Sequence, residues 1–203
     1  GTVTWTGSVS GVWDMATTAN FTDGTSAVVF NEGNSAIFND TPGADQNVTA
    51  NGVIKAFDVT FSNNRHSYKI IPGDNGGKIT GRGTLTIDNG GDVTMGVANE
   101  LEGGTALKNG RLRLASTDAV AGLGKSINVT EGAIDFCLNN TANNYAVVET
   151  PIVLNGKPVD VYTSRYTYWT SPVSGTGDIN IYCGGERSYM GHQKNKVQPD
   201  WSN

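Results

Sequence analysis

Two stretches of the chain, Gly81-Arg82-Gly83-Thr84-Leu85-Thr86-Ile87 and Gly175-Thr176-Gly177-Asp178-Ile179-Asn180-Ile181, have the same outline. Each has two glycines one residue apart, followed by a short strand in which apolar and polar residues alternate. A shorter form of this unit occurs between them, as Gly110-Arg111-Leu112-Arg113-Leu114 and Gly132-Ala133-Ile134-Asp135-Phe136. A glycine turn followed by a strand is therefore a repeated unit, and repetition at about 20 to 30 residues is typical of solenoids.

The apolar residues of these strands occupy alternate positions, so they share one face, which we expect to point inward. The connecting segments are too long for hairpins and carry further short strands, such as Val93-Thr94-Met95 and Ile127-Asn128-Val129. Only Ser116–Leu123 suggests a short helix. We therefore predict an all-β chain that forms a right-handed parallel β-helix, with coils of about 20 to 27 residues.

The two ends of the chain differ in composition. Trp5, Trp13 and Phe21 lie near the start, where large aromatic side chains can cover an open solenoid end with little backbone. We predict a single β-helix domain over residues 1–203, with a cap and first coil in 1–40 and further coils in 41–203. The last residues, Pro199-Asp200-Trp201-Ser202-Asn203, contain no capping element, so we expect an open edge and a chain excised from a longer protein.

The overall composition narrows the class of partner. Of the 203 residues 37% are hydrophobic and only 16% are charged, which favours short strands joined by tight turns. The net charge is −5 and no cluster of Lys and Arg is present, so we expect no nucleic-acid partner. No apolar run approaches the roughly 20 residues of a membrane span, and the first residues lack the features of a signal peptide.

Residues that support catalysis or metal binding are sparse. The only histidines are His66 and His192, and no Gly-x-Ser-x-Gly nucleophile motif is present. Asp74, Asp88 and Asp92 lie next to Asn-Gly sequences that indicate turns, with a Ca²⁺ site as the alternative. We therefore expect no catalytic residues, no metal, no cofactor and no enzyme activity; a truncated polysaccharide lyase or hydrolase is an alternative.

The two cysteines, Cys137 and Cys183, lack the spacing of a metal site and are too few for a disulfide scaffold. They form a disulfide only if the fold brings their Cα atoms within about 7 Å of each other. Two unpaired thiols in or near strands are the other reading. The sequence leaves both open, so the cysteines do not decide the cellular compartment.

Several short motifs resemble autotransporter-associated β-strand repeats. The motifs near the start are Thr4-Trp5-Thr6-Gly7, Trp13-Asp14, Ala19-Asn20-Phe21 and Val28-Val29-Phe30-Asn31. Those that resemble the body of the repeat are Gly103-Gly104-Thr105-Ala106-Leu107, Gly110-Arg111-Leu112-Arg113-Leu114 and Gly122-Leu123-Gly124. The resemblance covers residues 1 to about 136 and implies a β-helix. It also implies one candidate role, a structural stalk or adhesin passenger of a surface protein.

The C-terminal third is similar to β-helical segments attached to glycan-degrading enzymes of gut Bacteroidetes. The similar residues are Gly175-Thr176-Gly177, Gly184-Gly185-Glu186-Arg187 and Asp200-Trp201-Ser202. Such segments include parallel β-helix modules that bind xylan and accompany xylanases. This resemblance implies a non-catalytic carbohydrate-binding module for a β-linked plant polysaccharide such as xylan. It also implies a covalently linked catalytic domain and a secreted or cell-surface location in a bacterium.

Polysaccharide binding by a rigid β surface needs aromatic rings that stack on sugar faces and polar groups that reach the hydroxyls. Residues 162–169 are the densest aromatic cluster, and Tyr182, Arg187, Tyr189 and His192 follow one coil later. In an extended strand Tyr166 and Tyr168 point one way and Trp169 the other, so we expect that both sets cannot be buried. The predicted carbohydrate-binding residues are Tyr162, Arg165, Tyr166, Tyr168, Trp169, Arg187 and Tyr189.

Overall fold

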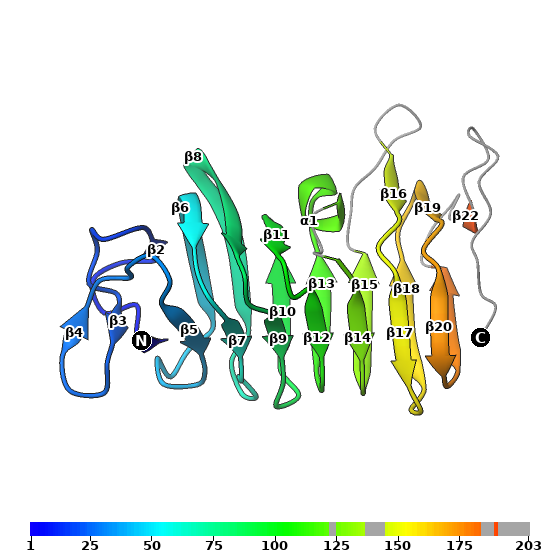
Figure 1. Cartoon of the computed structure of the whole chain (residues 1–203), viewed down its shortest axis with the longest axis horizontal. Coiled ribbons are helices and arrows are strands. Elements are labelled where there is room, and N and C mark those ends of the chain that lie inside the picture. Colours follow the sequence, from blue (N-terminus) through cyan, green and yellow to red (C-terminus); the bar gives the residue numbers. More distant parts are fainter. Residues whose placement is uncertain (122–124, 137–144, 184–188, 191–203) are drawn as a thin grey trace.

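A computed structural model of the protein describes residues 1–121, 125–136, 145–183 and 189–190. They form a parallel β-solenoid of about 6 turns, in which successive coils lie side by side along one axis (Figure 1). This confirms the predicted parallel β-helix. The strands are β1 (Thr2–Trp5), β2 (Val12–Trp13), β3 (Phe21–Thr22), β4 (Ala27–Val28), β5 (Ser35–Phe38), β6 (Gln46–Lys55), β7 (Val59–Phe61), β8 (Tyr68–Gly81), β9 (Leu85–Ile87), β10 (Asp92–Met95), β11 (Ala98–Leu101), β12 (Thr105–Leu107), β13 (Arg111–Leu114), β14 (Ile127–Val129), β15 (Gly132–Phe136), β16 (Ala146–Val148), β17 (Ile152–Asn155), β18 (Val159–Thr163), β19 (Thr167–Trp169), β20 (Val173–Thr176), β21 (Ile179–Cys183) and β22 (Tyr189–Met190).

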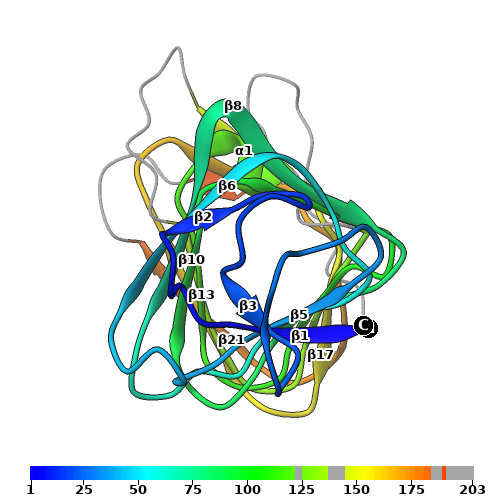
Figure 2. The same ribbon diagram turned by 90° about the vertical axis from the view of Figure 1, so that its left-hand side faces the viewer.

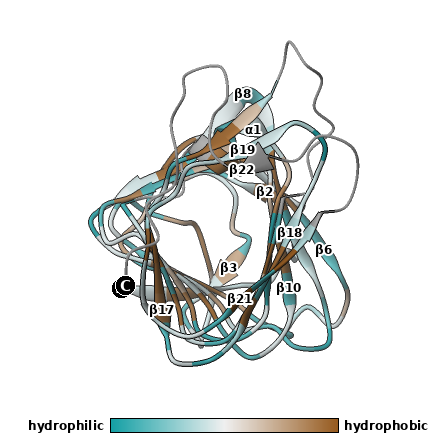
Figure 3. Ribbon diagram, turned by 90° about the vertical axis from the view of Figure 1, so that its right-hand side faces the viewer, coloured by the Kyte–Doolittle hydropathy of each residue, from teal (hydrophilic) through white to brown (hydrophobic). Residues whose placement is uncertain are grey.

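The strands form three sheets that make the sides of the solenoid. The first sheet has the order β20-β17-β14-β12-β9-β7-β5-β1-β3-β4, and the second has the order β2-β6-β8-β10-β13-β15-β18-β21. A three-stranded sheet, β16-β19-β22, completes the C-terminal coils on the third side. Seen along the axis, the coils enclose one interior (Figure 2). Coloured by hydropathy, the hydrophilic residues gather toward the outer turns (Figure 3).

The interior is built from columns of apolar residues that the parallel register aligns from coil to coil. In one column Val59 pairs with Leu85 and, beyond the buried Thr105 of the following coil, Ile127 pairs with Ile152. Buried and partly exposed residues alternate along these strands, as in β9 and β12. The predicted inward pairs Leu85/Ile87 and Leu112/Leu114 are fully buried, because each has a coil on both sides.

The glycines of the repeated unit lie where the backbones of neighbouring coils approach most closely. Gly81 has a φ of +148°, and a Cβ there would lie 1.8 Å from the carbonyl oxygen of Ala56. Gly132 has a φ of +130°, and its Cβ would lie 2.4 Å from the carbonyl oxygen of Gly110. Side chains at these positions would separate the coils, which explains why glycine recurs before each strand.

Aromatic rings fill the N-terminal end of the solenoid, as the sequence predicts. Trp5, Trp13, Phe21, Phe30 and Phe38 are all buried and contact one another through their rings. The short strands β3 and β4 pair antiparallel, and β3 lies within the outline of the coils in the axial view (Figure 2). This hairpin ends the parallel ladder and covers the interior.

Two local predictions meet different outcomes. The short helix is present as α1 (Thr117–Ala121), which lies beside β11 and β16. The segment predicted as a turn after Asp74 lies within strand β8, where Gly76 has the left-handed φ of +73° that the prediction expects of a glycine. In the pairing with β6, Pro72 faces Ala50 and Gly77 faces Gly52, so residues 73–76 are accommodated as an irregularity of the strand. Among the described residues no helix is long and apolar enough to cross a membrane.

Candidate functional site

Three of the predicted binding residues have side chains that are almost completely buried. Tyr166 and Tyr168 expose 5% of their surface each and Trp169 exposes 1%. The expectation that Tyr166 and Tyr168 or Trp169 would be exposed is therefore wrong, since both sides of this strand are covered. These three rings are not available to stack on a sugar in this structure.

The position of β19 explains why both of its sides are buried. Trp169 pairs in register with the buried Val148 and belongs to the hydrophobic core. Tyr168 pairs with Val147, on the opposite side of the strand, and its ring meets that of Tyr145 edge to face at 5.0 Å between centroids. Strand alternation gives the direction of each side chain but not what covers it.

Arg165 lies at the surface, in the turn between β18 and β19. Its guanidinium carbon is 5.0 Å from the centre of the Tyr166 ring, within the range of a cation–π contact. Tyr166 itself has a φ of +55°, a left-handed conformation that is uncommon for residues other than glycine. The structure thus keeps Arg165 accessible, but pairs it with a buried ring.

Tyr162 lies on a different surface, the outer side of the second sheet. In the register of β18 and β21 it is aligned with Tyr182, and the two rings stack at 4.8 Å between centroids with 14° between their planes. Tyr182 exposes 47% of its surface, whereas Tyr162 is partly buried. Tyr182 is therefore the accessible aromatic ring of the C-terminal cluster among the described residues.

Arg111 contacts the Tyr162 ring from β13, across one intervening strand. Its guanidinium carbon is 4.7 Å from the ring centre. The residue aligned with Arg111 on the intervening strand β15 is Ala133, whose small side chain lets the arginine reach across. Tyr162 therefore contacts a cation and a second ring, and the stack continues to the more exposed Tyr182.

Two arginines and two carboxylates form a network beside the stacked rings. Asp135 Oδ2 accepts hydrogen bonds from Arg111 Nη2 at 2.7 Å and from Arg113 Nη1 at 3.2 Å. Arg113 Nη2 also donates to Asp92 Oδ2 at 3.3 Å. Asp135 holds both arginines, and its side chain is only 14% exposed. We call Asp92, Arg111, Arg113, Asp135, Tyr162 and Tyr182 the outer ladder.

Asp160 and Asn180 supply further polar groups on the same outer surface. They are aligned in the register of β18 and β21, two positions before Tyr162 and Tyr182 respectively. Asn180 Nδ2 donates a hydrogen bond of 3.1 Å to Asp160 Oδ1. Because residues two apart in a strand point to the same side, these amide and carboxylate groups flank the stacked rings. The surface thus combines an aromatic ring with hydrogen-bonding groups.

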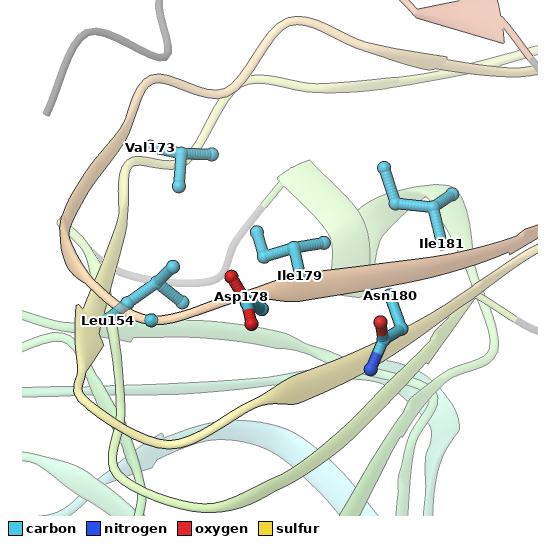
Figure 4. A pocket seen from close by; sticks show the side chains of 7 residues that line it. Leu154, Val173, Asp178, Ile179, Asn180 and Ile181 are labelled. Atoms are coloured by element: carbon cyan, nitrogen blue, oxygen red, sulfur yellow. The ribbon is translucent and has the colours of Figure 1, made fainter.

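The hollow shown in Figure 4 lies at the last described coil and has a different character. Leu154, Val173, Ile179 and Ile181 line it with apolar side chains, and Asp178 and Asn180 also take part. Ile179 and Ile181 are the inward residues of the repeated unit, but they are only partly buried. The hollow contains no aromatic ring among its described lining residues, so it offers no stacking surface.

Several predicted residues lie wholly or partly outside the described part of the chain. Arg187 is outside it, as are His192 and Trp201. The backbone of Tyr189 pairs with Tyr168 through β22, but its side chain is not described. Cys137 is likewise outside the described residues, so the disulfide with Cys183 and the two unpaired thiols both stay open.

Arg111, Asp135 and Tyr182 were missing from the predicted site. Their signal was in the repeated unit, where they occupy the polar positions that alternate with the inward residues. Aligning those positions coil by coil puts Arg113, Asp135, Tyr162 and Tyr182 in one column. Within the described residues, no group of three or more His, Cys, Asp or Glu side chains is placed to hold a metal ion.

Comparison with known proteins gives no match to a family model, to a curated protein or to a solved structure. The resemblances to autotransporter-associated repeats and to xylan-binding modules therefore gain no support from these comparisons. The fold is established by the parallel register of the strands. Any functional role has to be argued from the surface chemistry of the coils.

Proposed function

We propose that this chain is a non-catalytic binding module for a β-linked plant polysaccharide of the xylan class. The observation that supports the proposal best is the exposed ring of Tyr182, held in a stack with Tyr162 and Arg111. An exposed aromatic side chain on a rigid sheet provides a large contact area at a small cost in side-chain entropy. The sheet is regular at this point, since β18 and β21 pair over five aligned positions.

The arrangement of the outer ladder suits a sugar chain in two ways. The ring of Tyr182 is accessible to the apolar face of a sugar, and Asp160 and Asn180 lie beside it for hydroxyl groups. The aromatic contact supplies affinity, and the polar groups supply orientation. The carboxylates of Asp92 and Asp135 are engaged by arginines, so the proposal gives them a supporting role and assigns no reaction to them.

A module of this kind acts by tethering. If the chain is covalently linked to a glycoside hydrolase, binding to the polysaccharide raises the local concentration of the enzyme at its substrate. Modest affinity is then sufficient, because the linked domains bind together. The proposed partners are the polysaccharide and a linked catalytic domain, at a secreted or cell-surface location.

Affinity electrophoresis tests the proposal directly. We expect native gels that contain soluble arabinoxylan to retard the wild-type chain, and Tyr182→Ala to weaken the interaction about tenfold. Phe57→Ala is a matched control, because Phe57 is also exposed, by 49%, but lies outside the outer ladder. Equal retardation of Tyr182→Ala and wild type would exclude this surface, and absence of wild-type retardation in arabinoxylan and mixed-linkage glucan would exclude the module.

A structural stalk or adhesin passenger is the second candidate. Two features favour this role, the continuous parallel pairing of strands from coil to coil and the buried aromatic rings that close the N-terminal end. Both contribute to a rigid, rod-like solenoid. This role predicts no retention of the wild-type chain by any of the glycans and no effect of Tyr182→Ala. The electrophoresis experiment therefore separates the two candidates.

A further inference from the structure

The balance of charges on the outer ladder indicates which class of polysaccharide it accepts. The guanidinium groups of Arg111 and Arg113 share this surface with the carboxylates of Asp92, Asp135 and Asp160. Arginine residues are the usual partners of ligand carboxylates, because they offer paired donors in one plane. Whether these arginines are available to a ligand therefore decides whether an acidic sugar is recognised.

Both guanidinium groups are already engaged within the protein. Arg111 donates to Asp135 at 2.7 Å and lies over the ring of Tyr162, and its Nε is buried away from solvent. Arg113 bridges Asp135 at 3.2 Å and Asp92 at 3.3 Å. The carboxylates of Asp135 and Asp92 match both positive charges, so a ligand carboxylate that approaches these arginines gains no unpaired cation.

We propose that the outer ladder selects neutral polysaccharides and rejects polyuronates, an inference that rests on the proposed function and deepens it. The paired arginines contribute no unmatched positive charge, and Asp160 adds a carboxylate that only Asn180 contacts in the described surface. A uronate placed on Tyr182 would meet this carboxylate and would lose hydration without gaining a cationic partner. A neutral sugar escapes this cost, because its hydroxyls both donate to Asp160 and accept from Asn180.

Releasing the arginines should convert the specificity. In Asp135→Asn both guanidinium groups lose their shared carboxylate, and we expect affinity for polygalacturonate to rise roughly tenfold over wild type. Asp118→Asn is the matched control, because Asp118 is exposed on α1, outside the outer ladder, so its loss changes the net charge equally but releases no guanidinium. Affinity electrophoresis in polygalacturonate and in neutral arabinoxylan, at low and high salt, measures both preferences; the new interaction should weaken at high salt.

The outcomes distinguish the inference from the proposed function. Retardation of the wild type in arabinoxylan but not in polygalacturonate, with a gain only in Asp135→Asn, supports both. Equal retardation of the wild type in both glycans overturns the selectivity while the binding function stands. A gain of equal size in Asp118→Asn shows that overall charge decides, and overturns the role of the paired arginines. Absence of wild-type retardation in both glycans removes the proposed function.

A second variant keeps the test decisive if Asp135→Asn does not fold, as checked by circular dichroism. The side chain of Asp92 is more exposed than that of Asp135, and its carboxylate pairs with Arg113 at 3.3 Å. Asp92→Asn should therefore fold and give a smaller gain in polygalacturonate, about threefold, because it releases one side of one guanidinium. No gain in a folded Asp92→Asn would count against the inference.

Discussion

A pair of stacked aromatic rings occurs toward each end of this solenoid, but one pair lies inside the core and the other lies on the outer surface. Near the N-terminus Phe38 and Phe61 stack at 4.8 Å with 16° between their planes, inside the core. Near the C-terminal end of the described chain Tyr162 and Tyr182 stack at 4.8 Å with 14°, on the outer surface. The distance matches the spacing of neighbouring strands, which sets the geometry of both stacks.

The comparison shows that the spacing between neighbouring strands sets the distance between the two rings. The face of the strand, inner or outer, decides whether the stack stabilises the core or is accessible to a ligand. The rings of Phe38 and Phe61 are buried and contact other aromatic rings of the core, and those contacts stabilise the fold. The Tyr162 and Tyr182 rings bury less surface and leave one ring accessible to solvent. A change in the inner stack should therefore affect folding, and a change in the outer stack should mainly affect binding.

Truncation of the inner stack should give the largest effect. Phe38 is fully buried and its ring contacts Trp5, Trp13, Phe21, Phe61 and Tyr68. We expect Phe38→Ala to lower the free energy of unfolding by about 3–5 kcal/mol, because it leaves a cavity among rigid rings. Urea denaturation followed by circular dichroism measures this loss, with Tyr182→Ala as the outer-stack control at about 1 kcal/mol or less. Equal losses in the two variants would contradict the comparison.

Truncation of the inner member of the outer stack should have an intermediate effect on stability and a clear effect on binding. Tyr162 contacts both Arg111 and Tyr182, so Tyr162→Ala should cost about 1–2 kcal/mol of stability. It should also reduce retention in arabinoxylan, because Tyr182 loses the ring that orients it. Tyr162→Phe keeps both ring contacts and should behave as wild type in both assays. Full retention by Tyr162→Ala would show that Tyr182 needs no support.

The sequence predicts the fold well because the signals of a solenoid are local. Alternation in Leu85-Thr86-Ile87 defines the inward face, and glycines such as Gly81 mark the points where neighbouring backbones come close. The aromatic residues near the start likewise predict the buried aromatic cluster at the N-terminal end, which includes Trp5 and Trp13. None of these inferences requires knowledge of which residues meet across coils.

The site is predicted less well because it depends on the register between strands and on which side chains are buried by other segments of the chain. Arg111 reaches Tyr162 diagonally across β15, and knowing that these two residues come together requires the length of each coil. The burial of Tyr168 depends on contacts outside its own strand, including the ring of Tyr145. Strand alternation in the sequence contains neither kind of information.

The turn beside the inner stack contains the carboxylate of Asp40, whose protonation offers a smaller perturbation of stability. Asp40 follows Phe38 by two residues, and its carboxylate accepts hydrogen bonds from the backbone N–H groups of Asn64, Arg65 and His66 at 3.0–3.3 Å. Burial alone would raise the pKa of Asp40, but these donors outweigh it and lower the pKa below 3.8. The carboxylate thus stabilises the turn that leads into Tyr68.

Acidification should therefore weaken the inner stack and give the smallest of these effects. Because the pKa of Asp40 is lower in the folded chain, its stabilisation is fully present above the unfolded pKa and is lost as the pH falls through the folded pKa. We expect the urea midpoint of the wild type to fall as the pH drops below about 4, and Asp40→Asn to remove part of that fall. An identical profile for Asp40→Asn and wild type would show that the backbone donors of this turn do not couple the charge to the inner stack.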